Sequence, residues 1–170
     1  HHGDYQWKMM KAGDITDPGE KISLSDYPTE QWLPAIVPGT VLNSLVYNQK
    51  YPEPYYRVNN KIESKLIPDI SQVGRDFYTY WFRTEFEVPA SFLGKNILLQ
   101  PDGINYRAEV WVNGNLLSTI NGMFVNDYIN ITDFVKVGNK NVLAVKVYPV
   151  DVPGTTMPKS WGAVGEYHNG

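Results

Sequence analysis

Alternation of hydrophobic and polar residues is the strongest signal along this chain. In the segment YRAEVWV (106–112), every second residue from Tyr106 to Val112 shares one face, and Arg107, Glu109 and Trp111 share the other. Successive side chains of a β-strand point to opposite faces, so this pattern predicts a strand. Asn113-Gly114 follows, the pair best suited to the positive backbone angles of a two-residue turn. The segment 106–117 therefore predicts a β-hairpin.

Two other long segments alternate in the same way. YTYWFRTEFEVP (78–89) places aromatic and small residues on one face, and it ends at a proline, which cannot continue a ladder of hydrogen bonds. NVLAVKVYP (141–149) puts Leu143, Val145 and Val147 on one face. A short apolar strand is expected within 94–103. Turn signals recur about every ten residues, which predicts an all-β fold, an antiparallel β-sandwich, rather than a parallel sheet with crossover helices.

The first third and the last twenty residues lack this alternation. Thr40 is a suitable N-cap for a short amphipathic helix over 41–48. The segment 51–77 is long, irregular and aromatic, and a loop of that length in a compact domain is usually functional or packs on another element. Residues 151–170 are rich in Gly and Pro and contain Trp161 and His168.

Composition excludes several classes of protein. The 170 residues carry a net charge of −3, which argues against a protein that binds nucleic acid, and no basic run is present. There is no cysteine, which removes disulfides, thiolate metal sites and Cys nucleophiles. No apolar run approaches the roughly 18 residues of a membrane span, and we expect no signal peptide in this sequence. A periplasmic or secreted location is our expectation.

Catalytic constellations are sparse. His168 is the one histidine away from the N-terminus, so a Ser-His-Asp triad is not expected. His1 and His2 are compatible with a tag remnant and receive no role. Glu85 and Glu87 share a strand face, as a glycosidase pair could, but two such carboxylates are more often an ordinary solvated edge. We therefore expect no catalytic residue in this chain, and we expect no metal or other cofactor.

Four segments, taken in order, resemble one family. They are WLPAIVPGTVLNSL (32–45), YWFRTEFEVP (80–89), DGINYRAEVWVNGNLL (102–117) and ITDFVKVGNKNVLAVKVYP (131–149). Together they resemble the N-terminal sugar-binding domain of glycoside hydrolase family 2. The Pro-Gly-Thr-Val of the first segment is most similar to the β-mannosidase and exo-β-glucosaminidase branch.

The resemblance implies a jelly-roll, galactose-binding-domain-like sandwich that precedes an immunoglobulin-like domain and a (β/α)8 barrel. Two Glu on that barrel would hydrolyse O-glycosyl bonds with retention, which calls for carboxyl groups about 5 Å apart. We expect one domain over 1–170, with 1–31 as a lead-in and 151–170 as a loop toward the next domain. The implied partners are a β-linked carbohydrate and those downstream domains, and neither a nucleic acid nor a membrane.

The resemblance also implies which loop residues reach the sugar. They are Asp151, after the last long strand; Tyr55 and Tyr56, in the aromatic loop; and Trp161 and His168, near the chain end. Mannosidase-like members of the family carry an Asp-Trp pair that contacts the substrate in this last segment. That pair is missing from SWGAVGEYHNG (160–170), so the assignment of sugar-contacting residues there lacks its motif. A loop-capping role for Asp151 and an interdomain packing role for Trp161 remain open.

Two other classes of function stay open. One is an autonomous carbohydrate-binding module, which would need exposed aromatic residues on a concave sheet face or a Ca²⁺ loop. The other is a structural adhesion domain, which the four matched segments disfavour. For the face with Arg107, Glu109 and Trp111, we expect contact with a neighbouring domain or loop rather than a separate sugar site.

Overall fold

The structure is a computed structural model, and it describes residues 6–57, 59, 61–101, 103–104, 107–121 and 128–149. Strands predominate and the helices are short. The strands are β1 (Lys8–Lys11), β2 (Leu33–Pro34), β3 (Tyr80–Glu87), β4 (Leu98–Leu99), β5 (Arg107–Val112), β6 (Asn115–Asn121), β7 (Ile129–Asn130) and β8 (Lys140–Tyr148). The α-helices are α1 (Gly19–Ile22), α2 (Val41–Tyr47) and α3 (Ile70–Val73). The 3-10 turns are η1 (Ala12–Asp14), η2 (Ile62–Ser64), η3 (Arg75–Tyr78), η4 (Ala90–Phe92) and η5 (Thr132–Phe134).

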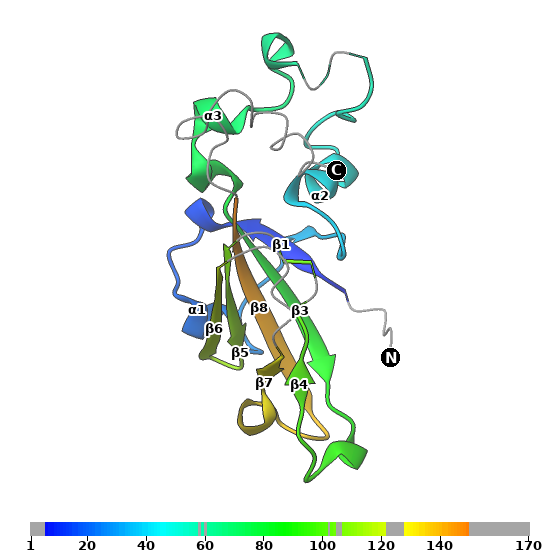
Figure 1. The fold of residues 1–170 in the computed structure, drawn as a ribbon, viewed down its shortest axis with the longest axis vertical. Coiled ribbons are helices and arrows are strands. Elements are labelled where there is room, and N and C mark those ends of the chain that lie inside the picture. The colour runs from blue at the N-terminus through cyan, green and yellow to red at the C-terminus, as the bar shows by residue number, and fades with distance from the viewer. Residues whose placement is uncertain are drawn as a thin grey trace.

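Six strands form one antiparallel sheet in the order β2-β1-β3-β8-β5-β6 (Figure 1). β4 and β7 pair antiparallel in a second, two-stranded sheet, and a parallel bridge joins Val88 to Val137. The long strands β3 and β8 lie side by side through the middle of the molecule (Figure 1). This arrangement confirms the predicted antiparallel sandwich of mostly sheet with few helices.

One face of the large sheet carries the main core. Ala108, Val110 and Val112 of β5 are fully buried, and Leu143 and Val145 of β8 pack beside them. Val88, Ile97, Ile120 and Ile131 complete this cluster, so the small sheet and its connections close over it. The core residues of β5 and β8 are those that the alternation of 106–112 and 141–149 put on one face, and that assignment is confirmed.

The opposite face is covered by the chain's own N-terminal third. Trp81, Trp111 and Ala144 are buried there against Ile22 and Trp32. The contact is close, because a Cβ atom built on Gly19 would lie 2.4 Å from Cε2 of Trp111. Trp111 thus packs on α1, which belongs to this chain. Of the face for which we expected contact with a neighbouring domain or loop, Arg107 and Glu109 instead contact Tyr148 of the adjacent strand β8.

A buried arginine holds that covering segment in place. Arg83 is 4% exposed, and it donates from Nε to the carbonyl of Ile22 at 3.1 Å and from Nη2 to the carbonyl of Leu24 at 2.8 Å. Its Nη1 lies 3.5 Å from the half-exposed Glu85 carboxylate. The guanidinium therefore satisfies the buried carbonyl of Ile22 and the partly buried carbonyl of Leu24, at the end of α1.

The lead-in contains a strand that the sequence pattern did not reveal. β1 lies between β2 and β3, with Met9 opposite Phe82 and Leu33. The segment KMMK shows apolar residues side by side, because Met9 faces one cluster and Met10 the other. Both faces of β1 are covered, so period-two alternation is absent.

The predicted helix and turn are confirmed. α2 covers 41–47, and the Thr40 hydroxyl accepts a hydrogen bond from the amide of Asn43 at 3.0 Å, which caps the helix. The turn residues Asn113 and Gly114 have φ angles of 47° and 88°. The Asn113 side chain also donates to Asn141 Oδ1 at 2.8 Å, which fixes the turn against the start of β8.

We predict that Arg83→Met destabilises the fold, because the buried carbonyl of Ile22 and the partly buried carbonyl of Leu24 lose their donor. The free energy of unfolding should fall by about 3 kcal/mol, measured by urea denaturation of the 170-residue chain. Glu85→Gln is the control, since the Glu85 side chain is 42% exposed and its ion pair should contribute less than about 1 kcal/mol. Equal effects of the two substitutions would contradict this account.

Candidate functional site

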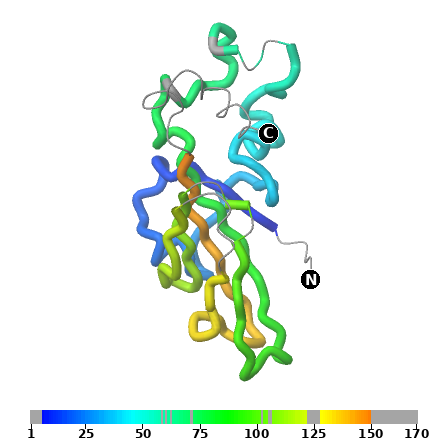
Figure 2. The backbone as a smooth tube through the Cα atoms, viewed as in Figure 1, coloured from blue at the N-terminus to red at the C-terminus, as the bar shows by residue number. Residues whose placement is uncertain are grey.

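The connections that carry the predicted sugar-contacting residues leave the sheet at one end. Arg107, the first residue of β5, lies opposite both Tyr148 at the end of β8 and Asn121 at the end of β6. Tyr80, the first residue of β3, lies opposite Val147 and Lys11. The chain therefore enters β3 and β5, and leaves β1, β6 and β8, at this end, which we call the loop end (Figures 1 and 2).

A polar and aromatic cluster marks the loop end of the sheet. We call it the Tyr148 cluster, and it consists of Arg107, Glu109, Lys146 and Tyr148. The Tyr148 hydroxyl donates to Glu109 Oε1 at 2.6 Å, and the Arg107 guanidinium carbon lies 4.5 Å from the centre of the Tyr148 ring. Lys146 Nζ lies 5.2 Å from the same ring centre. Cations against a ring face and a charge-assisted hydrogen bond fix the position of this side chain.

The environment keeps the Tyr148 phenol protonated. Partial burial raises its pKa to about 12, and the hydrogen bond to Glu109 adds to the shift, while Arg107 opposes it. Tyr148 is therefore a hydrogen-bond donor near neutral pH and does not serve as a base. Two cations and one carboxylate give the Tyr148 cluster a small positive charge, beside the point where the chain leaves β8.

The long segment between α2 and β3 is fixed at both of its roots. Tyr51 packs against the cluster that contains Met9 and Tyr80. Near the other root, the Tyr78 hydroxyl donates to the carbonyl of Pro68, and burial raises the pKa of Tyr78. Arg75 Nη2 donates to the carbonyl of Pro149 at 3.2 Å. That last bond ties the segment to the residue that follows β8.

Tyr55 and Tyr56 lie between these roots and are strongly exposed, at 76% and 58%. The backbone amide of Tyr55 donates to Glu53 Oε1 at 3.3 Å, and that of Tyr56 donates to the Glu53 carbonyl at 3.2 Å. The Arg57 guanidinium lies 5.1 Å from the Tyr56 ring centre. A turn thus presents two aromatic rings outward, and their contact with sugar stays a prediction.

The other predicted site residues, Asp151, Trp161 and His168, lie outside the described residues. Glu85 is an ordinary solvated carboxylate: its side chain is 42% exposed, it pairs with Arg83, and its Oε2 lies 3.9 Å from Lys140 Nζ.

The sequence did not single out Tyr148, because its partners Arg107 and Glu109 reach it only through the β5–β8 register. The one sign of this cluster in the sequence was that Tyr148 follows Lys146 by two residues on a predicted strand, so that the two side chains share a face.

Two kinds of feature are absent from the part of the chain that is described. Within it, no three His, Cys, Asp or Glu side chains gather in a way that could hold a metal ion. Within the same residues, no helix has the length and apolar character needed to span a bilayer.

Comparison with known proteins gives the family. Residues 7–159 match the model of the glycosyl hydrolase 2 galactose-binding domain-like family, and this chain belongs to that family. It is 36% identical over 170 residues to a mannosylglycoprotein endo-beta-mannosidase of Lilium longiflorum, covering 98% of this chain and 17% of the relative. It is 30% identical over 156 residues to an exo-beta-D-glucosaminidase of Amycolatopsis orientalis, covering 90% of this chain and 14% of the relative.

A solved structure supports the same assignment. The crystal structure of the Amycolatopsis orientalis exo-chitosanase CsxA superposes with a TM-score of 0.71 at 28% identity, over 87% of this chain and 16% of that one. The chain thus spans 14–17% of the length of the relatives that it matches here. The part that it matches is the N-terminal β-sandwich domain of family 2 β-glycosidases, and its described residues contain no (β/α)8 barrel.

We predict that Glu109→Gln lowers the pKa of Tyr148 from about 12, because the carboxylate that favours the neutral phenol is lost. The pKa should stay above 10.0, since burial is the larger cause of the shift. An alkaline titration followed by ¹³C NMR of the tyrosine Cζ atoms measures it, with Tyr148→Phe to assign the resonance. An unchanged pKa in Glu109→Gln would show that the hydrogen bond is not formed in solution.

Proposed function

We propose that this segment is the accessory sugar-binding domain of a retaining β-glycosidase of the β-mannosidase, β-galactosidase or exo-β-glucosaminidase type. The main evidence is the family match over residues 7–159. The relatives named above support it, since all three are far longer glycosidases. An immunoglobulin-like domain and a catalytic (β/α)8 barrel would follow in the same protein. In this proposal the protein acts in the periplasm or is secreted.

The role of the domain would be to complete the rim of the substrate pocket. The geometry that supports this is the gathering of connections at the loop end, together with the bond from Arg75 to Pro149 at the exit of β8. Loops from a rigid sheet place side chains accurately at a neighbouring pocket. Tyr55 and Tyr56 would line that rim by stacking, and Asp151, Trp161 and His168 are candidates from the sequence alone.

The ligand of such a rim is the non-reducing end of a β-linked glycoside. A carboxylate that accepts hydrogen bonds from two sugar hydroxyls in a site with little water would fix the orientation of the sugar ring. Asp151, two residues after Pro149, is placed by the sequence for this role. Aromatic rings would hold the apolar face of the sugar.

The first test is the activity of the 170-residue chain alone. We predict no hydrolysis of aryl β-mannoside, β-galactoside or β-glucosaminide above the buffer blank. The described carboxylates Glu85 and Glu109 are held by Arg83, Lys140 and Tyr148, and they do not form a pair for retaining chemistry. The full-length protein is the positive control. Turnover that survives repurification and is abolished by Glu85→Gln or Glu109→Gln would overturn the proposal.

The second test concerns Asp151 in the full-length protein. We predict that Asp151→Ala lowers kcat/KM by roughly one to two decades, because a charge-assisted hydrogen bond of about 1.5–3 kcal/mol is lost. The measurement is made at substrate well below KM. Asp133→Ala is the matched control, since Asp133 is an exposed carboxylate in η5, away from the loop end. Full activity of Asp151→Ala would show that this loop only supports the fold.

A further inference from the structure

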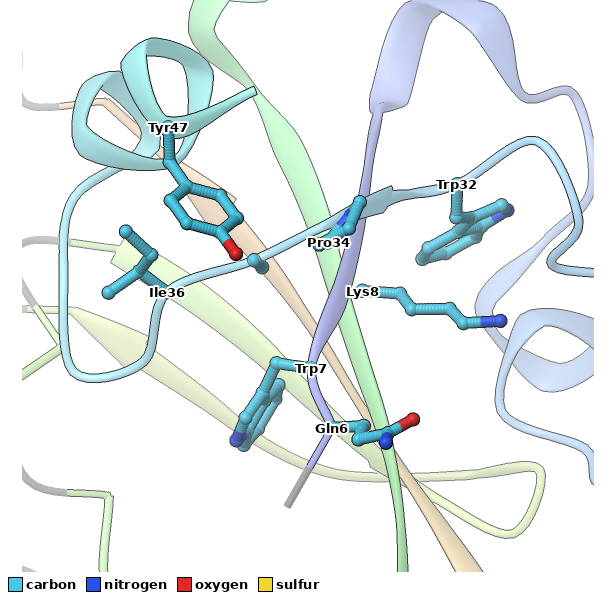
Figure 3. A pocket seen from close by; sticks show the side chains of 8 residues that line it. Gln6, Trp7, Lys8, Trp32, Pro34, Ile36 and Tyr47 are labelled. Atoms are coloured by element: carbon cyan, nitrogen blue, oxygen red, sulfur yellow. The ribbon is translucent and has the colours of Figure 1, made fainter. Parts of the chain in front are cut away.

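The edge of the large sheet carries a groove that the proposed function does not use. It has a volume of about 460 Å³ and lies where β1, β2 and α2 meet (Figure 3). Its lining residues are Gln6, Trp7, Lys8, Trp32, Pro34, Ala35, Ile36 and Tyr47. A volume of this size is within the range of sites for small ligands, about 300–1,000 Å³.

Aromatic rings stand on both sides of the edge strand. Trp7, Ile36 and Tyr47 lie on one side of Pro34, and Trp32 and Lys8 lie on the other (Figure 3). Tyr47 is 64% exposed, whereas Trp7 is half-buried and Trp32 shows only 8% of its surface. The groove therefore offers one largely exposed ring beside two rings that are anchored in the core clusters.

The walls of the groove are fixed before any ligand arrives. The amide of Ile36 donates to Ser44 Oγ at 3.0 Å, and Asn48 Nδ2 donates to the carbonyl of Pro34 at 2.7 Å, so β2 and α2 are joined on both sides of Tyr47. The amide of Ala35 donates to the carbonyl of Trp7 at 2.9 Å. A site held in this way loses little entropy when it binds.

The polar groups in the groove suit a neutral ligand. Lys8 Nζ already donates to Thr29 Oγ1 at 2.9 Å and to the Thr29 carbonyl at 3.4 Å, so its charge is drawn toward the covering segment. Gln6 brings an uncharged amide that both donates and accepts. Among the residues that the structure describes, no acidic side chain lines this groove.

A peptide strand is a poor fit at this edge. β2 has only two residues, and one of them is Pro34, which has no N–H to donate to an added strand. The Pro34 carbonyl already accepts from Asn48. A pyranose ring suits the site better, because its C–H face packs on an aromatic ring while its hydroxyl groups reach uncharged donors and acceptors at the margin.

We propose that this groove is a second carbohydrate-binding site, which holds a neutral hexopyranose chain across the β2 edge. One sugar ring would pack on Tyr47 and Trp7. Gln6, whose side chain points to the Lys8 side (Figure 3), would bind hydroxyl groups of the next ring, where the sugar chain crosses the edge. The inference rests on the proposed carbohydrate-active function, and it adds a surface site at the sheet edge that would keep a polymeric substrate close to the enzyme.

Affinity electrophoresis of the full-length protein tests the proposal. Native gels contain soluble galactomannan, glucomannan or mixed-linkage β-glucan, and the retardation gives a dissociation constant for each. We expect at least one neutral polysaccharide to retard the wild-type protein. Tyr47→Ala should weaken that binding about tenfold, the equivalent of roughly 1.4 kcal/mol from a lost aromatic contact.

Tyr128→Ala is the matched control, because Tyr128 is 60% exposed and lies beside β7 in the small sheet, away from the groove. Its retardation should equal that of the wild type. Absence of retardation in every gel, or equal retardation of Tyr47→Ala and wild type, would overturn the proposal. A lower Tm of Tyr47→Ala with unchanged retardation would assign the groove to packing against the rest of the protein, which also overturns it. This test measures electrophoretic mobility, whereas the tests of the proposed function measure turnover. The groove proposal and the proposed function can therefore fail independently.

Discussion

The structure depends on the way in which the second face of the large sheet is covered. Trp81 and Trp111 make that face strongly apolar, and exposed together they would form a patch that a folded domain must bury. The chain buries it with its own residues 12–32, which Arg83 holds through the carbonyls of Ile22 and Leu24. Because a short segment with little regular structure does the covering, its attachment relies on this buried guanidinium and on the close fit of Gly19 under Trp111.

Covering both faces leaves only the ends and the edges of the sheet for binding. At the loop end, the register of β5 and β8 brings Arg107 and Glu109 to Tyr148, and Arg75 reaches the carbonyl of Pro149. At the edge, the short strand β2 and the helix α2 form an aromatic groove. The two places differ in chemistry: the first is charged and lies beside the exit of the chain, whereas the second is aromatic and almost neutral.

This division matches a domain that works beside a catalytic partner. A sheet closed on both faces is a rigid support, and the family match assigns the chain to the N-terminal sandwich of much longer glycosidases. Because binding residues lie on loops and the sandwich only supports them, the loop end can vary among relatives while the sandwich is kept. The proposed rim function uses the loops, and the proposed groove uses a surface that the sandwich itself creates.

The sequence by itself determined the all-β class, the strands of residues 78–89, 106–112 and 141–148, the capped helix after Thr40 and the family, because alternation, turn chemistry and motif order are local signals. Tertiary structure alone decided the rest. β1 was hidden because both of its faces are covered, which removes alternation. The segment that covers Trp111 and the partners of Tyr148 depend on contacts between residues that are far apart in the chain. Likewise, Trp7 and Tyr47 share a groove only because β2 and α2 are joined there, through hydrogen bonds whose pairing the residue types do not encode.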